Sequence, residues 1–205
     1  MSDSVSKIFG KHALSYLKQF GDVTPYAPGL DFFLSRIPEK GKILDLGCGP
    51  GNLSTYCLNS LPNLKVTGID SAPEMVELAS MTEDRAEFIE LKIEEIHTLH
   101  GTFHGFLAGG CFPYISDQEL VASIEHLNSL CKNKSALFVS SMIHEESTSR
   151  IESDGEGDSM RVWYRSKEEI PTLLERFGWK VKFEMEVLGN QDSVYQEMVW
   201  VACRG

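Results

Sequence analysis

One acidic residue and three glycines stand close together in a pattern that could bind a cofactor. An apolar run that contains Asp45 leads directly into Gly47, Gly49 and Gly51, which occupy alternate positions. Glycine adopts backbone angles that other residues avoid, and it lets a ligand approach the main chain closely. We therefore expect a buried strand that ends in a tight turn and feeds a helix, with a cofactor lying on the turn.

The spacing of these residues discriminates between two kinds of nucleotide cofactor. A dinucleotide site favours Gly-x-Gly-x-x-Gly, with the pyrophosphate at the helix N-terminus. Here the position of the third glycine is taken by Asn52. The Asp45 carboxylate would repel a pyrophosphate but would attract a cofactor that carries an ammonium group. A nicotinamide oxidoreductase is therefore disfavoured.

At these residues the chain resembles the class I S-adenosylmethionine-dependent methyltransferases. The resemblance rests on Ile43-Leu44-Asp45-Leu46-Gly47-Cys48-Gly49-Pro50-Gly51 and on Val66-Thr67-Gly68-Ile69-Asp70-Ser71-Ala72-Pro73-Glu74-Met75-Val76-Glu77-Leu78-Ala79, and it extends over most of residues 42–205. It implies a Rossmann-like α/β fold, with a seven-stranded mostly parallel sheet, helices on both faces and a C-terminal antiparallel hairpin. It also implies S-adenosyl-L-methionine as the cofactor and S-adenosyl-L-homocysteine as its product.

The same resemblance assigns cofactor contacts to particular residues. Asp45 would attract the cofactor ammonium, and Asp70 would accept hydrogen bonds from both ribose hydroxyls. Tyr16 lies in a segment similar to the family's N-terminal Ala-x-x-Tyr, so it would touch the cofactor carboxylate; aromatic packing on a helix face is an equally good interpretation. The other implied cofactor residues are Gly47, Cys48, Gly49, Gly51, Ser71, Met75, Ile93, Glu94 and Gly109.

Two positions depart from the family pattern. Lys92 stands where the family usually has an acid that meets the adenine, so the backbone of Ile93 and Glu94 would hold the base instead. His104 follows Phe103 where an aspartate is usual. A surface residue is the favoured interpretation of His104, and a titrating group is the alternative.

The acceptor side of the site is expected beyond the carboxyl ends of the strands, as in other open parallel sheets. Methyl transfer is an in-line displacement that needs positioning, and a base helps when the nucleophile is a hydroxyl or a protonated amine. His144 is the candidate catalytic base, with a polar loop histidine as the alternative. The candidate substrate-binding residues are Cys111, Tyr114, Arg161 and Tyr164. Arginines near position 161 could bind a carboxylate substrate.

These residues must be positioned by strands that alternate with helices, which is typical of a parallel sheet covered by helices. The expected strands are 43–46, 65–70, 87–93, 103–109 and 136–143, followed by a hairpin of 181–187 and 194–202 with Gly189 and Asn190 in its turn. The expected helices are 52–61, 73–81, about 117–131 and about 167–177. Two N-terminal helices, about 5–20 and 29–37, would cover the cofactor site. Residues 146–161 are interpreted as an irregular solvated loop, because their alternate acids lack the register of a calcium site.

Composition limits the classes of function. The chain has 205 residues and a formal net charge of −11, with no evident basic patch, which makes nucleic acid a poor candidate substrate. We expect one domain, with residues 1–41 as the cover and 42–205 as the core. The five cysteines and six histidines show no metal-ligand spacing, so we expect no metal. The start of the chain lacks the apolar core of a signal peptide and no segment is long enough to span a bilayer, so the expected location is the cytoplasm.

By elimination, the acceptor is expected to be a small molecule. The segment that follows the expected strand 103–109 lacks the Asn/Asp-Pro-Pro-Tyr/Phe sequence of amino-methylating enzymes that act on nucleic acid and on glutamine. The paired glutamates of protein-arginine enzymes are also not visible. Two alternatives stay open, namely an RNA or protein methyltransferase of the same fold and a non-catalytic subunit that binds S-adenosylmethionine. Neither the acceptor atom nor the oligomeric state follows from the sequence.

Overall fold

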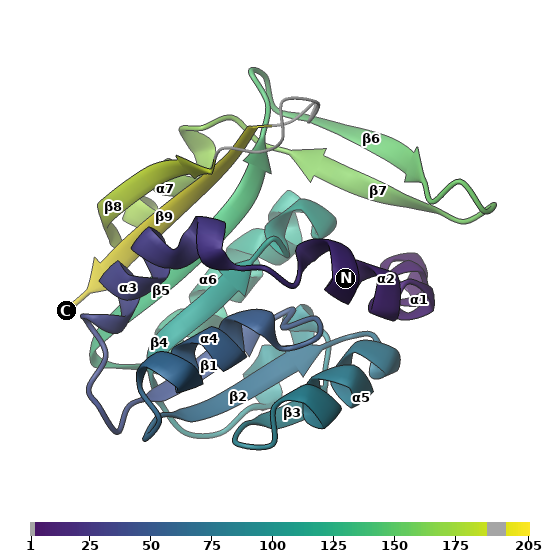
Figure 1. Cartoon of the computed structure of the whole chain (residues 1–205). Helices are drawn as coiled ribbons and strands as arrows, with labels where there is room; N and C mark the ends of the chain where they lie inside the picture. The colour runs from purple at the N-terminus through teal and green to yellow at the C-terminus, as the bar shows by residue number, and fades with distance from the viewer. Residues whose placement is uncertain (1–2, 188–195) are drawn as a thin grey trace.

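The apolar strands assemble into one seven-stranded sheet in the order β3-β2-β1-β4-β5-β9-β8 (Figure 1). The computed structural model describes residues 3–187 and 196–205. Strand β9 is antiparallel to both of its neighbours, and the other pairs are parallel. The strands are β1 (Lys42–Leu46), β2 (Lys65–Asp70), β3 (Glu87–Glu90), β4 (Phe103–Gly109), β5 (Cys131–Ile143), β8 (Lys180–Val187) and β9 (Gln196–Arg204). The predicted mostly parallel sheet with a terminal antiparallel pair is confirmed.

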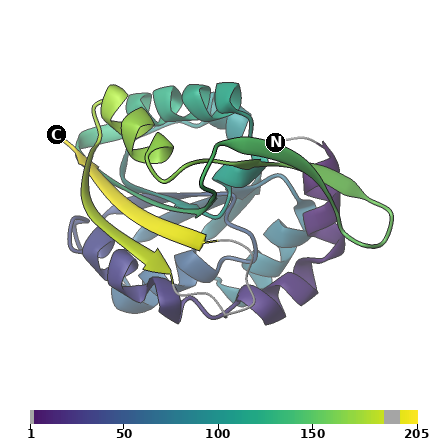
Figure 2. The same cartoon turned by 90° about the horizontal axis from the view of Figure 1, so that it is seen from above.

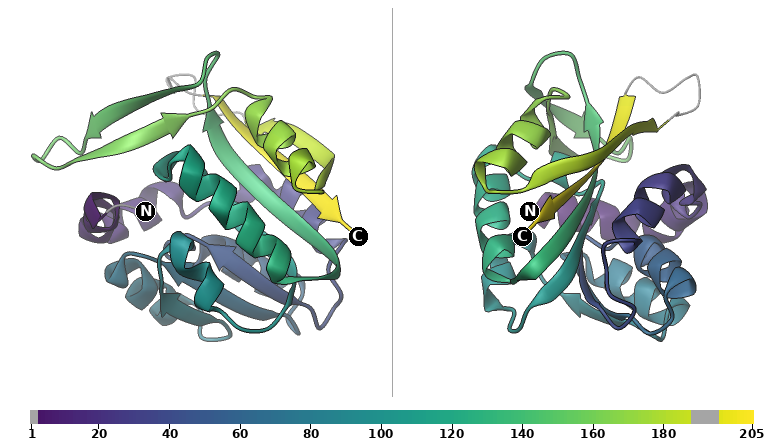
Figure 3. Two further views of the ribbon diagram at one scale, coloured as in Figure 1. Left: turned by 180° about the vertical axis from the view of Figure 1, so that it is seen from behind. Right: turned by 90° about the vertical axis from the view of Figure 1, so that its left-hand side faces the viewer.

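Helices cover both faces of the sheet, so that the strands are buried between two apolar layers (Figure 3). Successive residues of β1 face opposite layers, with Leu44 packed into one and Ile43 into the other. One layer contains α6 (Asp117–Ser129) and α7 (Glu169–Arg176), and the other contains α3 (Ala27–Leu34) and α4 (Asn52–Ser60). Helix α5 (Pro73–Thr82) packs beside β2 and β3. The described residues also contain three short 3-10 helices, namely η1 (Thr24–Tyr26), η2 (Ile93–Thr98) and η3 (Phe112–Tyr114).

Local signals in the sequence account for several helix ends. The Ser116 hydroxyl caps α6 by accepting a hydrogen bond from the Glu119 backbone N–H. In return, the Glu119 carboxylate accepts a hydrogen bond from the Ser116 backbone N–H at 2.6 Å. Pro73 occupies the first turn of α5, where its missing backbone N–H costs nothing. Such boundaries were predicted correctly because they depend on neighbours in sequence.

The N-terminal cover is made of two helices where the sequence predicts one over residues 5–20. Helix α1 (Asp3–Lys11) and helix α2 (Ala13–Phe20) are separated at His12, whose backbone is not helical. The break lets both helices fold over α5, where the Ser6 hydroxyl donates to the Ser71 carbonyl at 2.6 Å. The helices therefore lie beside the ends of β1 and β2, as a cover over this region requires.

The prediction of an irregular loop over residues 146–161 is wrong. Strands β6 (Thr148–Ser153) and β7 (Ser159–Tyr164) form an antiparallel hairpin that extends beyond the sheet (Figure 2). Its turn is closed by Asp154, whose carboxylate accepts backbone hydrogen bonds from Glu156 and Asp158. The acidic run, which was interpreted as a solvated loop, therefore forms the turn of this hairpin through Asp154.

Two smaller boundaries also differ from the prediction. Cys131, expected on the apolar stripe of a helix, begins β5 because α6 already ends at Ser129. Strand β3 ends at Glu90, and Ile93 begins η2 instead of closing a strand. The predicted turn residues Gly189 and Asn190 lie outside the described residues. Across residues 3–187 and 196–205, no helix combines the length and apolar character needed to cross a membrane.

Candidate functional site

The turn between β1 and α4 requires all three of its glycines. Gly47, Gly49 and Gly51 have φ angles of 59°, 53° and 82°, a region that other residues avoid. A Cβ at Gly47 would lie 2.7 Å from the Cys111 Cβ. At Gly51 it would lie 3.0 Å from the Phe88 ring, so this glycine permits close helix packing, the role expected for it. The turn thus presents bare backbone at the edge of the sheet.

Asp70 ends β2 and fixes the glycine turn from the neighbouring strand. Its carboxylate accepts hydrogen bonds from the backbone N–H of Gly49 and of Ala72, each at 2.9 Å. The side chain is nearly buried, and this burial raises its pKa in spite of the backbone donors. Each carboxylate oxygen keeps acceptor capacity, because two oxygens offer about four lone pairs. The Ser71 backbone is a third donor, and Asp70 still keeps acceptor capacity for a ligand.

Asp45 lies in β1, one residue before the strand ends at Leu46. The Ser54 hydroxyl donates to its carboxylate at 2.7 Å. Complete burial raises the pKa of Asp45 to about 7, and the nearby charge of Asp70 adds to this shift. A buried carboxylate of this kind favours a cationic partner, which would restore its ionised form.

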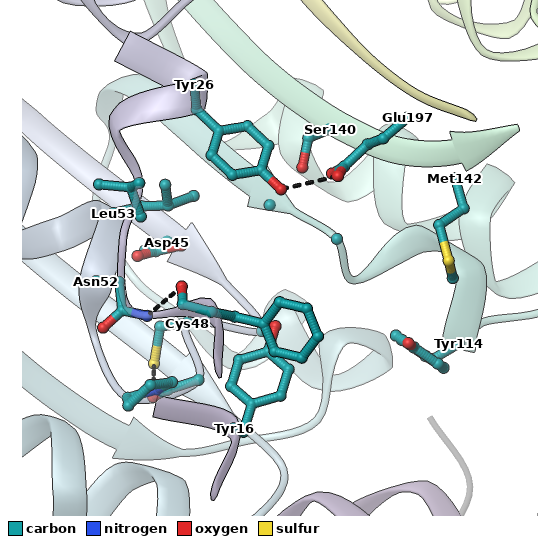
Figure 4. A pocket seen from close by; sticks show the side chains of 17 residues that line it. Tyr16, Tyr26, Asp45, Cys48, Asn52, Leu53, Tyr114, Ser140, Met142 and Glu197 are labelled. Carbon is teal, nitrogen blue, oxygen red and sulfur yellow. Dashed lines mark hydrogen bonds between the residues drawn. The ribbon is translucent and has the colours of Figure 1, made fainter. Parts of the chain in front are cut away.

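Two adjoining cavities lie beyond the ends of the strands, and Tyr16 lines both of them. Figure 4 shows the larger one. Asp45 borders the larger cavity and Asp70 borders the smaller one. Burial, and then the charges of Glu197 and Asp70, raise the pKa of Tyr16 to about 12. The residues shared by both cavities are Tyr16, Gly47, Gly49, Gly109, Gly110 and Tyr114.

Most residues that were predicted to hold the cofactor border these cavities. They are Tyr16, Asp45, Gly47, Cys48, Gly49, Asp70, Ser71, Met75 and Gly109, and the predicted substrate residues Cys111 and Tyr114 lie with them. Gly51, Ile93 and Glu94 border neither cavity. Gly51 acts in packing, and Ile93 lies behind the turn, 3.9 Å from the Cβ position of Gly47.

The remaining predicted residues lie outside both cavities. The His144 ring contacts the Glu146 carbonyl at 3.1 Å and the Arg150 guanidinium at 3.3 Å. Arg161 is exposed on the hairpin and donates to Ser149 at 2.9 Å. Tyr164 is buried and its hydroxyl donates to Glu152. This placement gives no support to the expected catalytic role of His144 or to substrate contacts from Arg161 and Tyr164.

Arg165, one of the arginines near position 161, is buried. Its guanidinium donates to the carbonyls of Phe112 and Ile115 at 2.8 and 2.9 Å, and to the Asp117 carboxylate at 2.8 Å. These bonds fix the segment that carries Tyr114 into both cavities. The Arg165 side chain is therefore committed to the protein and does not face a ligand.

The far wall of the larger cavity contains an acid that sequence reasoning missed. Glu197 on β9 accepts a hydrogen bond from the Tyr26 hydroxyl at 2.8 Å, and Ser140 and Met142 of β5 stand beside it (Figure 4). Glu197 is directly opposite Met142 in the strand register. A signal was present, because Glu197 is the only acid in an otherwise apolar strand over residues 197–203.

A cluster of charges joins the hairpin tip to α1. The Lys11 ammonium lies 3.0 Å from the Asp154 carboxylate and 2.9 Å from that of Glu156, and Lys7 lies 2.7 Å from Asp158. His12, Asp154 and Glu156 place potential metal ligands within 4.8 Å of one another. Since Lys11 already pairs with both carboxylates, we interpret the cluster as a clamp between the N-terminal cover and the hairpin.

Comparisons with known sequences agree with this geometry. Residues 43–134 match the family described as "Methyltransferase domain". A trans-aconitate 2-methyltransferase from Enterobacter sp. (strain 638) is 32% identical over 108 residues, covering 52% of this chain and 42% of the relative. A malonyl-[acyl-carrier protein] O-methyltransferase from Acetivibrio thermocellus is 27% identical over 164 residues, covering 75% and 58%. The chain thus spans about half the length of these curated relatives.

Solved structures share the fold over nearly the whole chain. A 1,6-didemethyltoxoflavin-N1-methyltransferase from Burkholderia thailandensis has a TM-score of 0.73 at 19% identity, covering 98% of this chain and 87% of its own. Magnesium protoporphyrin IX methyltransferase from Synechocystis PCC 6803 has a TM-score of 0.73 at 16% identity, covering 100% and 98%. The former structure contains S-adenosylhomocysteine and the latter S-adenosylmethionine.

Proposed function

Because this chain belongs to the class I S-adenosylmethionine-dependent methyltransferase family, we propose that it transfers a methyl group from S-adenosylmethionine to a small-molecule acceptor. One observation carries the proposal. Asp45, the bare backbone of Gly47 to Gly49, and Asp70 border two adjoining cavities at the ends of neighbouring strands. Each group matches one part of this cofactor, namely an ammonium, a methionine chain and a ribose.

The proposed cofactor position follows the order of the strands. Asp70, Ser71 and Met75 border the smaller cavity and would hold the adenosine. Asp45 borders the larger cavity and would neutralise the methionine ammonium. Bound S-adenosylmethionine supplies an activated methyl group on a sulfonium, so the protein's task is to position an acceptor and to exclude water.

Aromatic residues of the cover are well placed for that task. Tyr16 and Phe20 of α2 and Tyr26 of η1 line the larger cavity, and Tyr114 lines it from η3. Flat apolar walls favour a small organic acceptor over a polymer. The names of the curated relatives also support a small-molecule or carrier-bound acceptor, since one methylates trans-aconitate and another malonyl-[acyl-carrier protein].

The proposal is tested in two steps with the whole chain. Isothermal calorimetry should detect binding of S-adenosylmethionine and of S-adenosylhomocysteine, and no binding of NAD⁺. A metabolite panel is then screened for acceptor-dependent formation of S-adenosylhomocysteine. Folded protein that fails to bind S-adenosylmethionine would refute the proposal. Binding without turnover of any acceptor, including RNA and peptide samples, would favour the non-catalytic alternative.

A further inference from the structure

Glu197 lies on the opposite side of the larger cavity from the strand that carries Asp45. In the strand order β2-β1-β4-β5-β9, strand β9 is three strands away from β1, which carries Asp45. At about 4.8 Å per strand this separation is roughly 14 Å. Asp70 lies on β2, one strand further in the opposite direction. Asp70 and Glu197 therefore lie at opposite ends of the cavity system, and Asp45 lies between them.

Glu197 is held in place by donors from two other elements. The Tyr26 hydroxyl donates to one carboxylate oxygen at 2.8 Å, and the Ser140 hydroxyl also bonds to the carboxylate. Burial raises the pKa of Glu197, while these two donors oppose the shift. Two donors do not use the acceptor capacity of a carboxylate, which has about four lone-pair positions. Figure 4 shows the side chain at the cavity wall, with Tyr26 and Ser140 beside it.

The described charged residues that line the larger cavity are all acidic. Asp45 and Glu197 line it, and among its lining residues in the described parts of the chain there is no lysine, arginine or histidine. Arg161, which was expected to bind a carboxylate, lies on the exposed hairpin, and Arg165 is used by carbonyls of the protein. A carboxylate placed beside Glu197 would therefore meet a like charge with no cation to offset it.

We propose that Glu197 is a specificity-determining residue that accepts a hydrogen bond from an N–H or O–H group of the acceptor and excludes carboxylates from this end of the cavity. The rings of Tyr16, Phe20, Tyr26 and Tyr114 in the same lining favour an aromatic or heterocyclic acceptor. This inference rests on the proposed function, and it names the acceptor class for that site.

The test compares three ligands of similar shape that differ in charge. Protein loaded with S-adenosylhomocysteine is titrated with benzylamine, benzyl alcohol and benzoate, and dissociation constants are measured by ligand-observed NMR. The wild type should bind benzylamine about tenfold more tightly than benzoate, with benzyl alcohol between them. Glu197→Gln should lose most of this preference. The matched control Glu186→Gln changes an exposed acid on β8 and should keep it.

Several results would overturn the inference. The inference is wrong if the wild type binds benzoate as tightly as benzylamine, or if it binds none of the three ligands. It is also wrong if Glu197→Gln retains the full preference for benzylamine over benzoate. The wild-type comparison holds even if the variant does not fold. Calorimetry of S-adenosylhomocysteine precedes the titrations, so that its failure to bind refutes the proposed function as well. Bound S-adenosylhomocysteine with the wrong ligand preference refutes only the role of Glu197.

Discussion

Replacing Asp70 by alanine should remove most of the affinity for S-adenosylmethionine. In the proposed site the Asp70 carboxylate accepts hydrogen bonds from two ribose hydroxyls. The structure supports this capacity, because Gly49 and Ala72 donate to different carboxylate oxygens and the roughly four lone-pair positions exceed the three backbone donors, the third being Ser71. Alanine cannot replace either contact. It also frees the Gly49 N–H, so the glycine turn loses the anchor that shapes the cofactor surface.

The size of the effect follows from the number of lost contacts. A hydrogen bond to a charged group contributes about 1.5–3 kcal/mol, so two of them amount to about 3–6 kcal/mol. Since each 1.4 kcal/mol corresponds to about tenfold in affinity, the dissociation constant should rise by roughly 10²- to 10⁴-fold. Loss of the Gly49 contact adds to this change and also lowers the stability of the free protein.

Isothermal calorimetry of Asp70→Ala measures the change directly, at a temperature well below the thermal midpoint of the variant. Glu90→Ala is the matched control, because Glu90 pairs with Asp70 in the strand register but is exposed and borders neither cavity. The control should bind S-adenosylmethionine like the wild type. If folded Asp70→Ala keeps an affinity close to that of the wild type, the assignment of the ribose site is refuted.

Three further predictions concern charge and support around the site. Burial raises the pKa of Asp45 to about 7, and the ammonium of bound S-adenosylmethionine would lower this pKa. The affinity for S-adenosylmethionine should therefore rise from about pH 6 to 8, and calorimetry in two buffers should detect proton release on binding below about pH 7. Arg165→Met should destabilise the protein by about 2–6 kcal/mol in urea unfolding, since two buried carbonyls lose their donor, whereas exposed Arg161→Met should not. Lys11→Met should weaken the contact of α1 with the hairpin, which Lys7 then maintains alone from α1, and hydrogen exchange of residues 3–11 should become faster, while Lys40→Met should leave it unchanged.

The cofactor side of the site could be predicted because its signals are local. Asp45, the glycine turn and Asp70 each mark the end of a strand, and the pattern of apolar residues places those ends at one edge of the sheet. The positive φ angles of Gly47 and Gly49 confirm the reason for the glycines. The helix caps at Ser116 and Pro73 are of the same local kind.

The acceptor side could be predicted only in part, because most of it depends on contacts between distant segments. Cys111 and Tyr114 were expected there and do border the cavities. Tyr26 and Glu197 are 171 positions apart, and nothing near either residue indicates the other. His144 was chosen for its chemistry and its place after a strand, but its ring turns to Glu146 and Arg150 instead of the cavity. The hairpin was missed for a related reason, since the turn made by Asp154 looks like a solvated acidic run.

The hairpin β6–β7 also places a constraint on how related sequences can diverge. Its base is fixed where the His144 backbone N–H donates to the Arg165 carbonyl at 3.0 Å, and its tip must reach Lys11 on α1. Each strand residue spans about 3.4 Å, so deleting two residues from each strand would withdraw the tip by roughly 7 Å and abolish the contact. The residue types along the hairpin can change between related sequences as long as the strands still pair. Related sequences should therefore conserve the length of this hairpin more strongly than its amino-acid composition.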